Sequence, residues 1–168
     1  MISPDYCATL ARYNEWQNGS LIAAASGLDD AARGLDRGAF FGSIAGTFSH
    51  LLWADQMWMS RLDGWDKPDV SGRASATWVP DWARLVARRQ AADRRIRGWA
   101  EALDTGALQG DLIWFSGLTG REVTLAKWRA IAHFFNHQTH HRGQIHAMLT
   151  AAGVQPDDTD LFLMPQGD

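Results

Sequence analysis

The sequence predicts an all-α fold, a four-helix bundle in one domain with a small β-hairpin before the last helix. Four segments place apolar side chains at helical spacing, at about residues 4–26, 41–63, 80–105 and 125–152. The chain has 168 residues, the length of a single domain, and its hydrophobic fraction of 46% supplies one core. A long loop and the hairpin separate the helices, which favours a bundle with crossover connections over a simple up-and-down bundle.

The first two predicted helices have end signals in the sequence. Ser3 has the residue type of an N-cap, and Pro4 follows at the first helical position. The pattern of the first helix ends near Gly27, at about residue 26. The second helix extends from about Phe41, and Gly64 follows its last apolar residue, where helices commonly stop.

The third helix follows a long connection. Residues 66–78 contain Pro68, Gly72 and several small polar side chains, and we predict a loop there. Pro80 and Asp81 then begin the third helix, which ends shortly before Gly106.

A different pattern precedes the last helix. Residues 111–115 and 121–123 are short runs with β-branched or aromatic side chains around the turn at 117–120, which is typical of a hairpin. Thr124 is predicted to cap the last helix, and Gly153 is its expected stop.

Charge argues against a nucleic-acid partner. The chain has 16 basic and 19 acidic side chains, a net charge of -3, and so lacks the general attraction for phosphate backbones of basic DNA- or RNA-binding domains. Six arginines nevertheless crowd one short segment. We interpret them as a solvated helix face, because acidic residues are interspersed, rather than as an anion-binding patch. They are Arg84, Arg88, Arg89, Arg94, Arg95 and Arg97.

The N-terminus and the cysteine count indicate the cellular compartment and whether the chain associates with a membrane. The N-terminus lacks a basic segment followed by an apolar run, and no stretch approaches the roughly 20 apolar residues of a membrane span. Cys7 is the single cysteine, which excludes an intramolecular disulfide and which we interpret as a small buried hydrophobe. We therefore expect a soluble, cytoplasmic protein with no membrane partner.

Histidines are concentrated in the last helix, which holds five of the six in the chain. Side chains advance about 100° per residue, so with His137 at zero, His141 lies at about 40°, within the apolar arc of about 20° to 120°. His137 borders that arc. His133 and His140 fall outside it on the other side of His137, and His146 points away at about 180°.

The pair His137 and His141 has the spacing and direction that a metal ion requires. Both rings project from one face of the helix, and that face turns toward the bundle interior. Two hydrogen-bonded imidazoles in the core or at its rim are the alternative that this spacing leaves open. Gln138 stands where a metalloprotease H-E-x-x-H motif has its glutamate, which disfavours that activity.

His50 is the only histidine outside the last helix, and it lies well inside an apolar helix. A buried imidazole needs a hydrogen-bond partner or a metal, although His50 falls at the flank of the apolar stripe rather than at its centre. Asp55 lies within that stripe, and a buried carboxylate needs a partner such as an arginine, a tryptophan N–H or a ligand imidazole. We interpret Asp55 as structural, or as supporting a ligand, rather than as a direct fourth ligand.

At these residues the sequence resembles the DinB family, including its YfiT-like members. The resemblance covers nearly the whole chain and is carried by residues 13–18 (YNEWQN), 42–55 (GSIAGTFSHLLWAD) and, most specifically, 136–144 (NHQTHHRGQ). It implies a bundle of up-down-down-up type. It also implies metal ligands on the second and fourth helices, and these carry over onto His50, His137 and His141.

Three neutral imidazoles suit zinc or nickel best, with iron or manganese as further candidates, and they leave coordination positions open. An ion held there lowers the pKa of a water or a thiol. The resemblance thus implies a metal-dependent transferase or hydrolase acting on a small molecule, with a low-molecular-weight thiol as a candidate cosubstrate. The competing hypothesis is a non-catalytic, stress-responsive metal-binding protein. Gln144, about 20° from His137 on the same helix, is a candidate hydrogen-bond donor beside the metal ligands.

A second apolar stripe on the last helix concerns partners. Trp128, Ala132, Phe135 and His146 lie opposite the histidine face. Either other parts of the bundle cover this stripe or it pairs with a second copy of the chain. Because relatives in the family are commonly dimers, we expect a homodimer to which this helix contributes.

Overall fold

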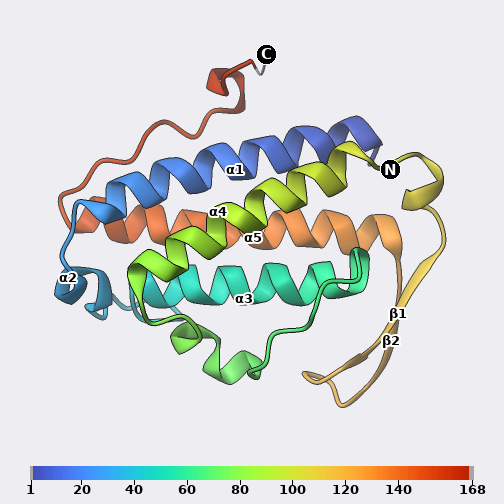
Figure 1. Ribbon diagram of the computed structural model, residues 1–168, viewed down its shortest axis with the longest axis horizontal. Coiled ribbons are helices and arrows are strands. Elements are labelled where there is room, and N and C mark those ends of the chain that lie inside the picture. Colours follow the sequence, from blue (N-terminus) through green and yellow to red (C-terminus); the bar gives the residue numbers. More distant parts are fainter. Residues whose placement is uncertain (1, 167–168) are drawn as a thin grey trace.

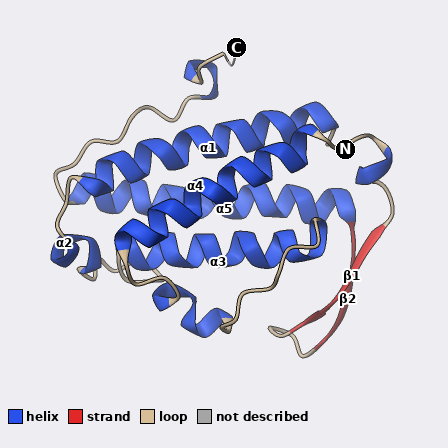
Figure 2. Ribbon diagram, in the orientation of Figure 1, coloured by secondary structure: helices blue, strands red, loops and turns tan. Residues whose placement is uncertain are grey.

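The structure is a computed structural model that describes residues 2–166 (Figure 1). Helices dominate it, and strands form only one hairpin (Figure 2). In chain order the elements are α1 (Pro4–Ser26), α2 (Asp30–Gly34), α3 (Ile44–Leu62), the 3-10 helix η1 (Gly72–Thr77), α4 (Trp82–Glu101), the 3-10 helix η2 (Gly106–Leu108), β1 (Asp111–Ser116), β2 (Arg121–Ala126), α5 (Lys127–Ala151) and the 3-10 helix η3 (Leu161–Leu163).

The four long helices form the predicted bundle. Helix α1 packs against α4 and α5, and α3 packs against the same two helices, so that α1 lies diagonally across the bundle from α3. Figure 1 shows α1 and α5 running in one direction and α3 and α4 in the other. The connection from α3 to α4 crosses back along the bundle, which confirms the up-down-down-up topology (Figure 1).

The start of α1 is confirmed, but α3 begins later than predicted. The Ser3 side chain accepts a hydrogen bond from the backbone of Tyr6, with proline at the start of α1. Helix α3 begins at Ile44 instead of residue 41, because Gly42 adopts a positive φ of 74° and pairs with Ala39 in an isolated bridge. The Ser43 side chain then accepts a hydrogen bond from the next turn and caps α3.

Helix α4 is shorter than predicted at both ends. It begins at Trp82, where the Asp81 side chain is the N-cap and accepts from the backbone of Arg84. It ends at Glu101, not near residue 105, and Gly106 opens the short helix η2. The loop predicted at residues 66–78 is also partly helical, because η1 forms within it.

The hairpin is confirmed and extends further than predicted. Thr124, predicted as the cap of the last helix, instead pairs with Ile113 in the antiparallel ladder. Strand β2 continues to Ala126, and α5 begins at Lys127 without a side-chain cap. The prediction for Thr124 was wrong because its β-branched side chain fits a strand as well as a cap.

The second apolar stripe of α5 is covered within the chain at Phe135, whereas Trp128, Ala132 and His146 stay partly exposed. Phe135 is 1% exposed, and its ring meets that of Tyr6 of α1 edge-on, 6.1 Å between centroids. Phe135 is therefore covered by another part of the bundle, the first of the two alternatives for this stripe. His146 also faces α1 and lines a pocket between the two helices.

Among the helices of the described residues, none combines the length and apolar character needed to cross a membrane.

Candidate metal centre

The structure brings His50, His137 and His141 together where α3 and α5 pack side by side. One ring-nitrogen donor from each histidine lies within 4.8 Å of the other two. Of the two ring pairs that join α3 to α5 in this group, His50 and His141 are the closer, with centroids 4.7 Å apart. His50 and His137 are 87 positions apart in the sequence. They meet here because the bundle places α3 and α5 in contact.

His50 has its proton position fixed by a residue of η1. The Nδ1 atom of His50 lies 2.9 Å from the Ser75 hydroxyl oxygen, and that hydroxyl donates to the carbonyl of Gly72 at 2.6 Å. Because the Ser75 proton is used on Gly72, Ser75 accepts the hydrogen bond and His50 donates it from Nδ1. The lone pair of His50 is therefore on Nε2, which is the form a metal ligand needs.

His141 has the same tautomer by a different route. Its Nδ1 lies 2.8 Å from the side-chain carbonyl oxygen of Gln144, which only accepts hydrogen bonds. The lone pair of His141 is thus also on Nε2, and this atom faces Nε2 of His137 at 3.1 Å. Gln144 therefore does contact a histidine of the group, as an acceptor rather than as the donor predicted.

The distances suit a single ion. Two nitrogen ligands of one ion with bonds of about 2.0–2.1 Å stand about 2.9–3.4 Å apart, which brackets the 3.1 Å between His137 and His141. Three points no more than 4.8 Å apart fit inside a circle of about 2.8 Å radius, so shifts under about 1 Å give ordinary bond lengths. The residues present fit a divalent metal.

Aromatic side chains enclose the His50 side of the cluster. The ring of Phe41 stacks on His50, with centroids 3.6 Å apart, and lies 5.4 Å from the ring of His141. Trp53 stacks near His50 at 6.1 Å. Phe41 therefore belongs to the site although it lies just outside α3.

The electrostatics of the site favour neutral imidazoles. Burial, with the neighbouring histidines as a further cause, lowers the pKa of His50 and of His137 to about 3. Burial also lowers the pKa of His141, against the opposing effect of its hydrogen bond to Gln144. Neutral rings keep their lone pairs, so the site is prepared to bind a cation near neutral pH.

A model of the DinB family matches residues 1–167, essentially the whole chain. The chain belongs to the DinB family. The searches of curated proteins and of solved structures gave no match. Membership in the family and the three-histidine cluster together suggest a divalent metal site.

In this DinB-family chain Asp55 belongs to a buried polar network beside the histidines. Its Oδ2 is 2.5 Å from Nη1 of Arg89 and accepts a hydrogen bond from Gln138 at 2.9 Å. Arg89 also pairs with Asp93 at 2.8 Å, and Asn18 donates to Asp93 at 2.9 Å. The network ties all four long helices together, and it supports the structural interpretation of Asp55.

The interpretation of the arginine segment as a solvated face was wrong for Arg89. Its side chain is 1% exposed, whereas Arg84 and Arg94 are exposed on α4 as predicted. The carboxylates that pair with Arg89 come from α3 and from one turn later on α4. The one indication in the sequence was Asp55, whose predicted burial required a partner such as an arginine.

Ser75, like Phe41, belongs to the site without any indication from the sequence. It lies in a segment predicted to be a loop and contacts His50 across 25 positions of the chain. The remaining histidines stay outside the cluster: the ring of His133 packs on Trp58, and His146 lies at the α1–α5 pocket.

Proposed function

We propose that His50, His137 and His141 hold one divalent metal ion, with zinc or nickel as the first candidates and iron or manganese as the next. The observation that carries this proposal is the pair of outer hydrogen bonds. Ser75 and Gln144 fix two of the rings in the tautomer whose Nε2 lone pair points inward. Outer partners of this kind orient imidazole ligands in metal sites.

We further propose that the chain is a metal-dependent transferase or hydrolase that acts on a small molecule, with a low-molecular-weight thiol as the first cosubstrate to test. An ion held by three protein nitrogens supplies a Lewis acid with open positions. In this scheme Ser75 and Gln144 orient the ligand rings, and Phe41 limits water on the His50 side. The alternative is a non-catalytic, stress-responsive metal-binding protein.

Turnover separates these two functions. Metal-loaded protein is incubated with bacterial thiols and a panel of electrophiles, including chloro-aromatics and epoxides, and with hydrolysable esters and amides. We expect turnover that disappears in His141→Ala and persists in His146→Ala, because His146 lies outside the cluster. Absence of turnover across the panel, with metal bound, would favour the non-catalytic alternative.

A cytoplasmic homodimer completes the proposal. The apolar stripe expected at the interface gives the dimer little support, since α1 covers its residue Phe135. The proposal of a dimer therefore rests on the family resemblance. Light scattering at micromolar concentration tests it, and a monomeric mass would refute it.

A further inference from the structure

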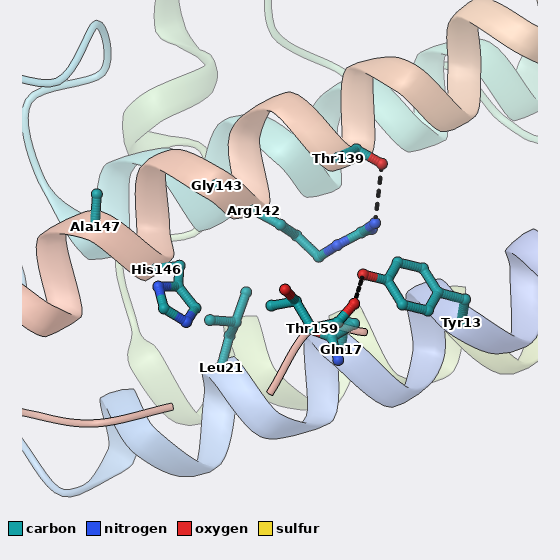
Figure 3. Close-up of a pocket in the computed structure, with 9 residues that line it drawn as sticks. All are labelled: Tyr13, Gln17, Leu21, Thr139, Arg142, Gly143, His146, Ala147 and Thr159. Atoms are coloured by element: carbon teal, nitrogen blue, oxygen red, sulfur yellow. Dashed lines mark hydrogen bonds between the residues drawn. The ribbon is translucent and has the colours of Figure 1, made fainter. Parts of the chain in front are cut away.

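A second candidate site lies between α1 and α5. The pocket has a volume of about 320 Å³, at the lower end of the range for small-molecule sites. Figure 3 shows its lining, with α5 on one side, α1 on the other and Thr159 of the C-terminal segment between them. The lining side chains are Tyr13, Gln17, Leu21, Thr139, Arg142, Gly143, His146, Ala147 and Thr159.

Arg142 is the charged residue of this pocket, and it is 5% exposed. Its side chain reaches from α5 toward Tyr13, and its Nη2 donates to the Thr139 hydroxyl at 3.2 Å (Figure 3). Its carbon Cζ lies 5.4 Å from the Tyr13 ring centroid. Within residues 2–166, Nη1 is buried without a hydrogen-bond partner and the guanidinium forms no ion pair.

The contrast with Arg89 shows what Arg142 lacks. Both guanidinium groups are buried, but Arg89 pairs with the carboxylates of Asp55 and Asp93 at 2.5 and 2.8 Å. A buried cation is costly unless an anion and hydrogen-bond acceptors satisfy it. Arg142 therefore combines a buried donor that has no partner among the described residues with a guanidinium that forms no ion pair, and its side chain lines a cavity.

Two other polar side chains of the pocket, Tyr13 and Gln17, are already engaged. The Tyr13 hydroxyl donates to the carbonyl of Thr159 at 2.6 Å, and the Gln17 amide donates to the carbonyl of Asp158 at 3.0 Å. The backbone N–H of Asp157 donates to Ser20 at 3.1 Å. These bonds hold the C-terminal segment across the pocket, while Nη1 of Arg142 has no hydrogen-bond partner among the described residues.

We propose that the α1–α5 pocket binds an oxyanion group, a carboxylate or phosphate of a small molecule, through the guanidinium of Arg142. The planar guanidinium fits both groups. The site is separate from the three-histidine cluster: His141 turns toward α3, whereas its neighbour Arg142 turns toward α1. Binding here does not depend on the proposed metal function.

Calorimetric titration of the full chain with acetate and with inorganic phosphate tests this site, with chloride at matched ionic strength as the reference. We expect saturable binding at about millimolar concentrations, as suits ligands of four or five non-hydrogen atoms. Arg142→Met lowers the affinity at least about tenfold, because a charge-assisted hydrogen bond is lost. The matched control is Arg129→Met, an exposed arginine on the same helix, which leaves binding unchanged.

A pocket-filling variant keeps the test decisive if Arg142→Met does not fold. A Cβ placed on Gly143 meets nothing within 4 Å, so Gly143→Leu extends into the pocket without a backbone clash. We expect it to abolish anion binding, and Gly98→Leu, at an exposed glycine of α4 with the same free space around an added Cβ, to bind anions as the unaltered protein does. Absence of saturable binding of both anions, or unchanged binding in Gly143→Leu, would overturn the proposal.

Discussion

Ser75 acts on the site through one hydrogen bond. Its hydroxyl oxygen accepts a hydrogen bond from Nδ1–H of His50, and its own O–H donates to the carbonyl of Gly72. It therefore determines which nitrogen of His50 is free, although it lies on η1 and not on the helices that hold the three histidines.

Ser75→Ala removes the acceptor for His50 and leaves the helix α3 intact. We expect metal affinity to fall about 10- to 100-fold, the usual effect of losing an outer partner of a ligand imidazole. Competition with a chromophoric chelator measures it. Ser71→Ala is the matched control, because Ser71 is exposed at the start of η1. Equal affinity in Ser75→Ala and the unaltered protein would show that Ser75 does not orient the ring.

Asp93 links the buried network to pH. Burial raises its pKa to about 6, against the opposing effect of Arg89, so in the folded state it takes up a proton above the unfolded value of 3.8. Its contribution to stability is fully present below pH 3.8 and is lost as the pH rises through about 6.

Asp93→Asn isolates this contribution. The free energy of unfolding of the unaltered protein, minus that of Asp93→Asn, is expected to increase by about 2 kcal/mol as the pH falls from about 7.5 to 4.5. Urea denaturation at a series of pH values measures this difference. A difference that stays constant or decreases on acidification would contradict the raised pKa.

At the scale of elements, the ion pairs of Arg89 join α4 to α3. Removing one partner of a buried pair leaves an uncompensated charge, so Arg89→Met is expected to lower the free energy of unfolding by about 3–5 kcal/mol. Chemical denaturation provides the measurement. Arg94→Met, on the exposed side of α4, serves as the control and should change stability by less than about 0.5 kcal/mol. A similar decrease in the free energy of unfolding in both variants would contradict a specific contribution of the Arg89 ion pairs.

Helical periodicity predicted the four long helices because each one buries a continuous apolar face. The ends were less predictable, since they depend on contacts distant in sequence. Residues 41–43 form a bridge and a cap instead of the first turn of α3. Residues 124–126 pair with β1 as the end of β2, so α5 begins only after them.

At the scale of the whole molecule, topology decides which histidines meet. The spacing of His137 and His141 was visible in the sequence, and the family resemblance supplied His50 as their partner. Ser75 and Arg89 could not be found in the same way, because their contacts arise only when η1 and α4 pack on α3. A helical wheel describes one helix and carries no information about which neighbour covers each face.

The most direct test of the central claim is the metal content of tag-free protein together with its single-histidine variants. Elemental analysis after incubation with zinc or nickel and removal of excess ion is expected to give about one ion per chain, since three converging nitrogens suit one ion. His50→Ala, His137→Ala and His141→Ala should each lose most of it, whereas His146→Ala retains it. Full metal content in His50→Ala, or none in the unaltered protein, would contradict a shared site between α3 and α5.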